Sequence, residues 1–156
     1  MPRPVPHVPR SARVTEQPTD PKEWINVLAE VPLFASLSTR HLRHVAGLAK
    51  IRRFHDGAVM MRAGDPGDAM FVILDGRASV RVARGRSVGI ELGAFVGELA
   101  LLDDGPRTAT VVASGPVIAL SVSRTGFRKL LRSEPSIAIA IAEELARRLR
   151  TAHTIA

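Results

Sequence analysis

Turn signals recur so often between residues 51 and 122 that they limit what this chain can fold into. Short apolar runs such as "MFVIL" and "VIALSV" alternate with turn segments such as "AGDPGD", "ARGRS" and "ASGP". Their spacing of about eight to twelve residues predicts a small all-β sandwich or barrel.

The segment "GRASVRV" has the pattern of a half-buried strand, because apolar and polar side chains alternate along it. The apolar face holds Ala78, Val80 and Val82, and the polar face holds Arg77, Ser79 and Arg81. The arginines would suit a nucleic-acid patch, but we interpret them as part of a solvated outer face.

Helical patterns precede the β region. A short helix is predicted near residues 24–30, with Asp20 and Pro21 as its cap and first-turn residues. The proline of "VPLFASLS" ends this helix, since proline cannot donate a helical hydrogen bond. Ser38 then has the character of a cap for a second helix that runs to about Lys50, whose apolar residues have helical spacing.

A last helix is predicted over about residues 136–151, where apolar residues recur at every fourth position. They are Ile137, Ile141, Leu145 and Leu149. Two ion pairs at i,i+4 spacing are also predicted, Glu143–Arg147 and Glu144–Arg148. An apolar stripe of this kind needs a partner. We expect that partner to be the β region in one state and a second chain in another, which predicts a weak homodimer.

Length and composition indicate one globular domain. A chain of 156 residues with 46% hydrophobic residues is long enough to bury a core. We expect the domain to occupy residues 22–156, with helices in 22–50, a β-roll in 51–122 and a C-terminal helical segment in 124–152. Residues 1–21 contain six prolines and three arginines without periodicity, which predicts a disordered tail.

Charge and cysteine content narrow the possible functions. The formal net charge of +7 suits an anionic ligand, nucleic acid or an anionic membrane surface. The absence of cysteine excludes disulfides, thiolate zinc sites and cysteine nucleophiles. The N-terminus lacks the apolar region of a secretory signal, and the run "IAIAIA" is too short to span a bilayer. We therefore expect a cytoplasmic protein without membrane insertion.

The histidines do not indicate a catalytic or metal site. His41 and His44 could share a metal on the second helix, but no third ligand lies at a useful spacing, and a solvated helix face fits them better. His55 and His153 have no partners that suggest a catalytic triad. A cupin enzyme would have a similar β-roll with clustered histidines, and only His55 lies in the β region. We expect no enzyme activity, no metal and no cofactor.

The segment "FVGELALLDDGPRTATV", residues 95–111, carries the candidate ligand site. Backbone amides that converge near Gly97 could bind an anion, because glycine permits close approach and Ala100 adds little bulk. Arg107 adds a planar guanidinium that is always charged. Glu98 would repel the anion, but as a hydrogen-bond acceptor it suits a sugar hydroxyl beside a phosphate. This chemistry indicates a site for a sugar phosphate or a nucleotide.

An ordinary β-turn-β connection with surface charges is the alternative for this segment. The adjacent Asp103 and Asp104 fit a role in supporting the turn before Gly105 better than a catalytic pair. From the residue chemistry alone, both interpretations stay open.

The same segment closely resembles the phosphate-binding cassette of the cyclic-nucleotide-binding domain family. This family includes the bacterial catabolite activator protein, the regulatory subunits of cyclic-AMP-dependent protein kinase and cyclic-nucleotide-gated channels. The motif comprises "GEL" at Gly97 and "PRTATV" at Pro106, and the resemblance extends over nearly all of residues 24–152. It implies an α+β, mainly β fold, in which helices at both ends flank an eight-stranded antiparallel, jelly-roll-like β-roll.

The resemblance also implies the ligand contacts. Arg107 would pair with the cyclic phosphate, and Glu98 would take the ribose 2′-hydroxyl. Backbone amides near three residues would complete the phosphate cradle: Leu99, Ala100 and Ala109. The apolar side of the pocket would be lined by Val80, Val82 and Leu92.

Base recognition would involve two further positions. Thr108 resembles the arrangement in which a hydroxyl accepts a hydrogen bond from the exocyclic amine of guanine. The activator protein reads adenine with a hydroxyl residue on its C-terminal helix, and the ungapped match puts Ala152 at that place. We expect cyclic AMP as the ligand, with cyclic GMP bound within about tenfold of it.

The resemblance predicts a cyclic-nucleotide sensor that signals by moving its C-terminal helix. No helix-turn-helix, kinase or channel sequence accompanies the cassette, so we expect an effector protein of unknown identity to supply the output. Nucleic-acid binding by this chain alone is not expected, because aromatic residues do not interleave with its basic tail. The alternatives are a protein-interaction module with a vestigial pocket and the sensor fragment of a transcription factor.

Overall fold

The computed structural model describes residues 21–81 and 85–152, so the predicted tail, Asp20, Val82 and His153 lie outside it. The helices are α1 (Pro21–Ala29), η2 (Pro32–Phe34), α2 (Thr39–Leu48), η3 (Glu98–Leu101), α3 (Arg124–Ser133) and α4 (Pro135–Ala152). The strands are β1 (Lys50–Phe54), β2 (Val59–Met61), β3 (Ala69–Asp75), β4 (Ala78–Arg81), β5 (Ser87–Ile90), β6 (Phe95–Val96), β7 (Thr110–Ala113) and β8 (Val117–Ser123). The predicted helices before and after the β region are thus confirmed.

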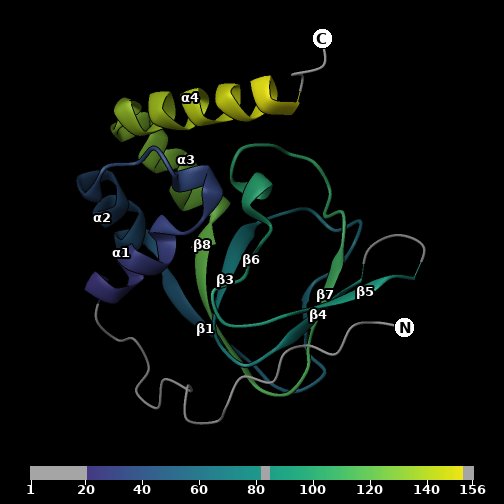
Figure 1. Ribbon diagram of the computed structural model, residues 1–156. Coiled ribbons are helices and arrows are strands. Elements are labelled where there is room, and N and C mark those ends of the chain that lie inside the picture. The colour runs from purple at the N-terminus through teal and green to yellow at the C-terminus, as the bar shows by residue number, and fades with distance from the viewer. Residues whose placement is uncertain (1–20, 82–84, 153–156) are drawn as a thin grey trace.

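Eight strands form two antiparallel sheets, as the family resemblance implied. One sheet has the strand order β1-β8-β3-β6 and the other has the order β2-β7-β4-β5. The helices gather on one side of this β-roll, and α4 lies across their top (Figure 1). The segment "GRASVRV" contributes β4, which pairs with β5 on one side and β7 on the other.

Strand β3 explains how the two layers are joined, because both of its faces are buried. Met70, Val72 and Leu74 point into the core that the helices share with the first sheet. Phe71 and Ile73 point into a second core between the two sheets. A continuous apolar run such as "AMFVIL" is typical of a strand that is covered on both faces.

The N-terminal helices form as their local sequence predicts. The Ser38 side chain caps α2 by accepting a hydrogen bond from the backbone N–H of His41, at 3.1 Å. Phe34 of η2 is fully buried and packs against Phe127 of α3, with ring centroids 5.8 Å apart. Along the part of the chain that the structure covers, no helix has the length and apolar character needed to cross a membrane.

Helix α4 buries only part of the stripe predicted for it. Ile137 and Ile141 are buried in the helical core, and Leu145 is half-buried beside them. Leu149, however, is 60% exposed. The first turns of α4 pack on the core, whereas Leu149 near its end does not, so the four residues do not form one buried stripe.

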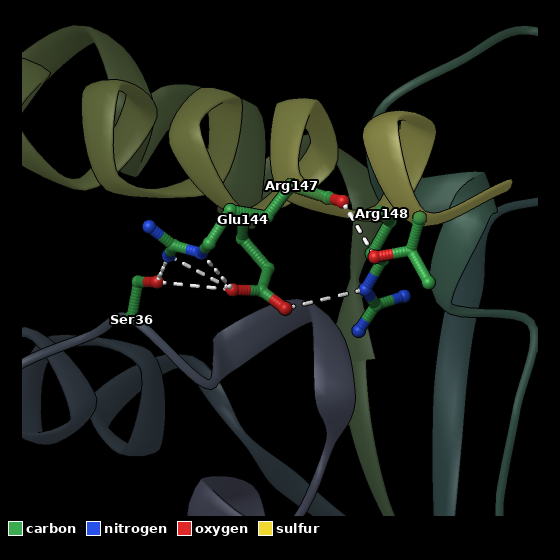
Figure 2. Close-up of polar contacts among 5 residues, drawn as sticks. Ser36, Glu144, Arg147 and Arg148 are labelled. Carbon is green, nitrogen blue, oxygen red and sulfur yellow. Dashed lines mark hydrogen bonds and ion pairs between the residues drawn. The ribbon is translucent and has the colours of Figure 1, made fainter. Parts of the chain in front are cut away.

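The ion pairs on α4 also differ from the prediction, as Figure 2 shows. Glu144 pairs with Arg148 at 3.4 Å, as expected from the i,i+4 spacing. Arg147 pairs with Glu144 at 2.9 Å rather than with Glu143. The Ser36 hydroxyl donates a hydrogen bond to the same carboxylate at 3.1 Å. Glu144 therefore joins α4 to the segment that follows η2.

Candidate functional site

Arg107 is a buried charge at the centre of the candidate site. Its side chain is only 5% exposed, and its Nη2 lies 3.3 Å from Oδ1 of Asp68. Burial lowers the pKa of Arg107, whereas the charge and hydrogen bond of Asp68 act in the opposite direction. The Nη1 atom has no hydrogen-bond partner among residues 21–81 and 85–152. A buried donor without a partner needs an explanation, and an anion beside it would supply one.

The loop between β2 and β3 fixes the backbone of Arg107. The Arg107 N–H donates to the Asp65 carbonyl, and the Gly64 N–H donates to the Arg107 carbonyl, both at 2.8 Å. Pro66 and Pro106 form an isolated bridge beside them. The sequence "AGDPGD", which the turn pattern alone marked only as a loop, thus holds the arginine and supplies its carboxylate partner.

Gly97 is the closest neighbour that the motif itself supplies. Its φ of +77° lies in the left-handed region, and a Cβ at this position would be 2.4 Å from Nη1 of Arg107. Both the backbone conformation and the space therefore require glycine. The close approach that the sequence predicted at Gly97 is made here by the Arg107 side chain.

The cassette backbone forms the short helix η3. The Ala100 N–H donates to the Gly97 carbonyl at 3.1 Å, so a phosphate would have to share this amide with that carbonyl. Ala100 and Ala109 are buried, Glu98 is half-buried, and Leu99 and Thr108 are exposed. The Glu98 and Thr108 side chains are therefore more accessible than Ala100 and Ala109, whereas Arg107 is as buried as these alanines.

The two aspartates of the cassette make different contacts. Asp103 Oδ1 accepts a hydrogen bond from the Gly105 N–H at 3.0 Å, which confirms the predicted role in the turn. Asp104 forms an ion pair with Arg124 at the start of α3, a contact that the sequence did not predict. The cassette is thus tied to the helix that leads into α4.

A cavity of about 270 Å³ opens beside Arg107. Its lining comes from β2, the loop after β2, and the arginine: Val59, Met60, Met61, Arg62, Asp65, Pro66, Asp68 and Arg107. Of the predicted ligand contacts, only Arg107 lines this cavity. No motif marks the other lining residues in the sequence, and the signal for Asp68 is only that of an acidic residue in the turn segment "AGDPGD".

The remaining predicted contacts lie on other elements. Val80 of β4 is half-buried against the core between the sheets. Leu92 is 49% exposed, in the turn between β5 and β6. Ala152 is exposed at the end of α4, a helix that packs mainly on η2 and α3. Within the described ranges, no group of three or more His, Cys, Asp or Glu residues could hold a metal ion.

A β-roll that buries an arginine with a free Nη1 donor, among the described residues, has the chemistry of an anion-binding domain. The family model described as "Cyclic nucleotide-binding domain" matches residues 51–134, more than half of the chain. The chain belongs to the cyclic nucleotide-binding domain family, as the cassette motif indicated.

Three known proteins illustrate the relationship. The chain is 40% identical over 117 residues to a cyclic nucleotide-gated potassium channel of Mesorhizobium japonicum, covering 75% of this chain and 32% of the channel. It is 32% identical over 106 residues to a cAMP-dependent protein kinase regulatory subunit of Hypocrea atroviridis, covering 68% of this chain and 23% of the subunit. The chain therefore spans about a third or less of the length of these relatives.

The third is a solved structure, the N-terminal domain of a transcriptional regulator from Streptomyces coelicolor. It matches with a TM-score of 0.73 and 31% identity, covering 82% of this chain and 95% of that domain. The fold is thus similar to domains found in channels, kinase regulatory subunits and transcriptional regulators.

Proposed function

We propose that this chain is a non-enzymatic sensor that binds a cyclic nucleotide in the β-roll. The observation that carries the proposal is the buried Arg107. It lies within the family's cassette motif, and its Nη1 has no partner in the described structure. A cyclic phosphate would give this guanidinium the charged partner that Asp68 supplies only to Nη2.

The other proposed contacts are those that the cassette resemblance implies. The phosphate lies against Arg107 and backbone amides near Leu99, Ala100 and Ala109, and Glu98 accepts a hydrogen bond from the ribose 2′-hydroxyl. Val80 and Leu92 line the apolar side. The exposed Thr108 hydroxyl favours a guanine amine, whereas Ala152 offers no polar group to an adenine, so we propose weak discrimination between bases. Cyclic AMP is the proposed ligand, supported by the name of the Hypocrea relative.

Calorimetric titration of the chain with cyclic AMP and cyclic GMP tests the proposal. Losing one partner of a buried charge pair costs about 2–5 kcal/mol. At about 1.4 kcal/mol per decade, Arg107→Ala should weaken binding at least tenfold, and up to about a thousandfold. Arg107→Lys keeps the positive charge but loses the planar guanidinium, so its affinity should lie between those of wild type and Arg107→Ala. Arg53→Ala changes an exposed side chain and should bind like wild type.

Three outcomes would contradict parts of the proposal. If wild type binds neither nucleotide, the sensor function fails and the interaction module becomes the better interpretation. If folded Arg107→Ala binds as tightly as wild type, the phosphate contact is wrong. If Glu98→Ala weakens cyclic AMP and its 2′-deoxy analogue equally, the hydroxyl contact is wrong.

The proposed signal is a change in the position of α4. A ligand can drive such a change only through different affinities for the two positions. The Asp104–Arg124 ion pair supports this route, because it connects the cassette turn to α3, which leads directly into α4. The output would reach an effector protein in the cytoplasm.

The outward face of α4 supports the proposed weak homodimer. Ile139 and Leu149 are each 60% exposed, and Ala142 and Ala146 are exposed between them. These four positions have the three-and-four spacing of a coiled-coil seam. A second copy of the chain would therefore pack on this face, which shares Leu149 with the stripe predicted from the sequence but not the buried Ile137 and Ile141.

A further inference from the structure

Helices α2 and α3 contain no acidic residue. Their sequences are "TRHLRHVAGL" and "RTGFRKLLRS". The basic residues in them are Arg40, Arg43, Arg124, Arg128, Lys129 and Arg132. Such a bias in two helices goes beyond the chain's overall excess of basic residues, since the other two α-helices, α1 and α4, contain both acidic and basic residues.

The two helices lie side by side, so their charges share one surface. Glu134, directly after α3, lies 3.8 Å from Arg40 and 3.6 Å from His44 of α2. Near the opposite ends, a Cβ on Gly126 of α3 would be 3.9 Å from Leu48 of α2. The helices are therefore antiparallel neighbours, in contact along most of their length.

Four basic residues of this helix pair are exposed, and we call them the basic face: Arg40, Arg43, Lys129 and Arg132. Within each helix the two residues are three apart and lie on the same side. All four are exposed, and the Arg40 side chain is 72% exposed.

Little on the molecule neutralises the basic face. Arg40 has only the long contact to Glu134, and in the described part of the chain Arg43, Lys129 and Arg132 form no ion pair. Like charges with so little counter-charge repel one another, which costs stability unless an anion offsets the repulsion. The arrangement is thus better suited to a bound anionic partner than to the isolated chain.

We infer that the basic face docks an acidic segment of a partner protein. The large exposed apolar side chains of the described structure lie outside α2 and α3, so the face offers nothing to insert into a lipid layer. Phe127 of α3, beneath the basic face, is fully buried and cannot stack on nucleic-acid bases. Three of the four residues in the basic face are arginines, and a guanidinium can form two parallel hydrogen bonds with one carboxylate.

The position of Glu134 gives this docking a consequence for the rest of the chain. Glu134 lies between α3 and α4, and its carboxylate is the acidic contact of Arg40. A partner carboxylate that binds Arg40 would compete with Glu134 at the junction that leads into α4. This surface is separate from the proposed nucleotide site, and its test does not depend on nucleotide binding.

The test measures binding of a fluorescein-labelled poly-glutamate peptide to the full chain by fluorescence anisotropy. Duplex DNA and vesicles of phosphatidylcholine with phosphatidylserine serve as the comparison probes. The variant Arg43→Glu/Lys129→Glu/Arg132→Glu should bind the peptide at least tenfold more weakly than wild type, which corresponds to about 1.4 kcal/mol. The variant Arg53→Glu/Arg81→Glu/Arg86→Glu makes the same change of charge on exposed residues of the β region and should stay within about threefold of wild type.

Glutamine replacements at the same three positions of the basic face remove charge without reversing it. They should give a smaller loss in the same direction, and circular dichroism checks that each variant is folded. Equal losses in the face variant and the strand variant would overturn the proposal, since binding would then follow net charge alone. The proposal would also be overturned if wild type bound duplex DNA or the vesicles more tightly than the peptide and the face variant lost that binding. The partner would then be a phosphate polymer or a membrane.

Discussion

Arg107 is subject to two opposing effects. Removal from water disfavours its charged form and lowers its pKa, while Asp68 stabilises that form. Guanidinium groups in proteins nevertheless stay protonated, so the charge persists. The Asp68 side chain is 89% exposed, which means that water weakens the contact it makes with Nη2. A ligand phosphate would therefore meet an arginine that is held in place and whose positive charge is only partly neutralised by Asp68.

Gly97→Ala tests whether the position of the Arg107 side chain depends on the space that Gly97 leaves beside it. The added methyl would meet Nη1 at 2.4 Å, and the φ of +77° would add strain of about 1–2 kcal/mol. We expect a lower melting temperature and a loss of nucleotide affinity of at least tenfold, because Arg107 must move.

Gly115→Ala is the matched control for this substitution. Gly115 has a φ of +87°, but a Cβ there would meet nothing within 4 Å. It should lower the melting temperature without changing nucleotide affinity. Thermal unfolding and calorimetry measure the two effects, and a Gly97→Ala protein with wild-type affinity would show that the arginine does not depend on this glycine.

At the scale of single elements, the position of α4 depends on one carboxylate. Figure 2 shows Ser36, Arg147 and Arg148 around Glu144, whose side chain is 14% exposed. The hydrogen bond from Arg147 is the main cause that lowers the pKa of Glu144. Apolar packing fixes the first turns of α4 through Ile137 and Ile141, whereas these polar contacts fix its middle.

The lowered pKa of Glu144 predicts a pH dependence. A carboxylate with a lower pKa in the folded state contributes stability above its unfolded pKa of about 4.3, and the contribution is lost as pH falls through the folded value. Wild type should therefore melt at a higher temperature than Glu144→Gln at neutral pH. The difference should vanish in acid.

Circular dichroism over a series of pH values measures this difference. Glu143→Gln, which changes the exposed neighbour of Glu144, should melt like wild type throughout. A constant gap between wild type and Glu144→Gln at all pH values would mean that the glutamate stabilises α4 by packing and not by its charge.

At the scale of the whole molecule, the helical layer and the β-roll are joined through β3 and β8 of the first sheet. Core residues on one face of these strands contact the helices, and residues on the other face contact the second sheet. The cassette lies at the edge of this arrangement, since η3 packs against both β3 and α3. The outward side of α4 is left open, with Ile139 and Leu149 exposed.

Sedimentation equilibrium tests the homodimer on this open side. Wild type should show a concentration-dependent dimer, and Ile139→Glu should shift it toward monomer because the charge would be buried in the seam. Val88→Glu places the same charge on a comparably exposed residue of β5 and should leave the dimer unchanged. Monomer alone at high concentration, with and without nucleotide, would contradict the proposal.

The sequence by itself determined the features that depend on near neighbours. The turn spacing predicted an all-β sandwich or barrel, and the run "AMFVIL" suits the doubly covered β3. The helix cap at Ser38 and the turn contact of Asp103 formed as expected. Each of these rests on contacts or periodicity within a few residues, which a sequence displays directly. The cassette motif likewise identified the family.

Only the tertiary structure decided which distant groups meet. Asp68 and Arg107 are 39 positions apart, and Ser36 and Glu144 are 108 apart, so no local pattern pairs them. Helix α4 carries two apolar stripes, and helical periodicity cannot say which one is buried. Packing against Phe127 and the other core residues selected the face with Ile137 and Ile141, and that choice left Ile139 and Leu149 on the surface.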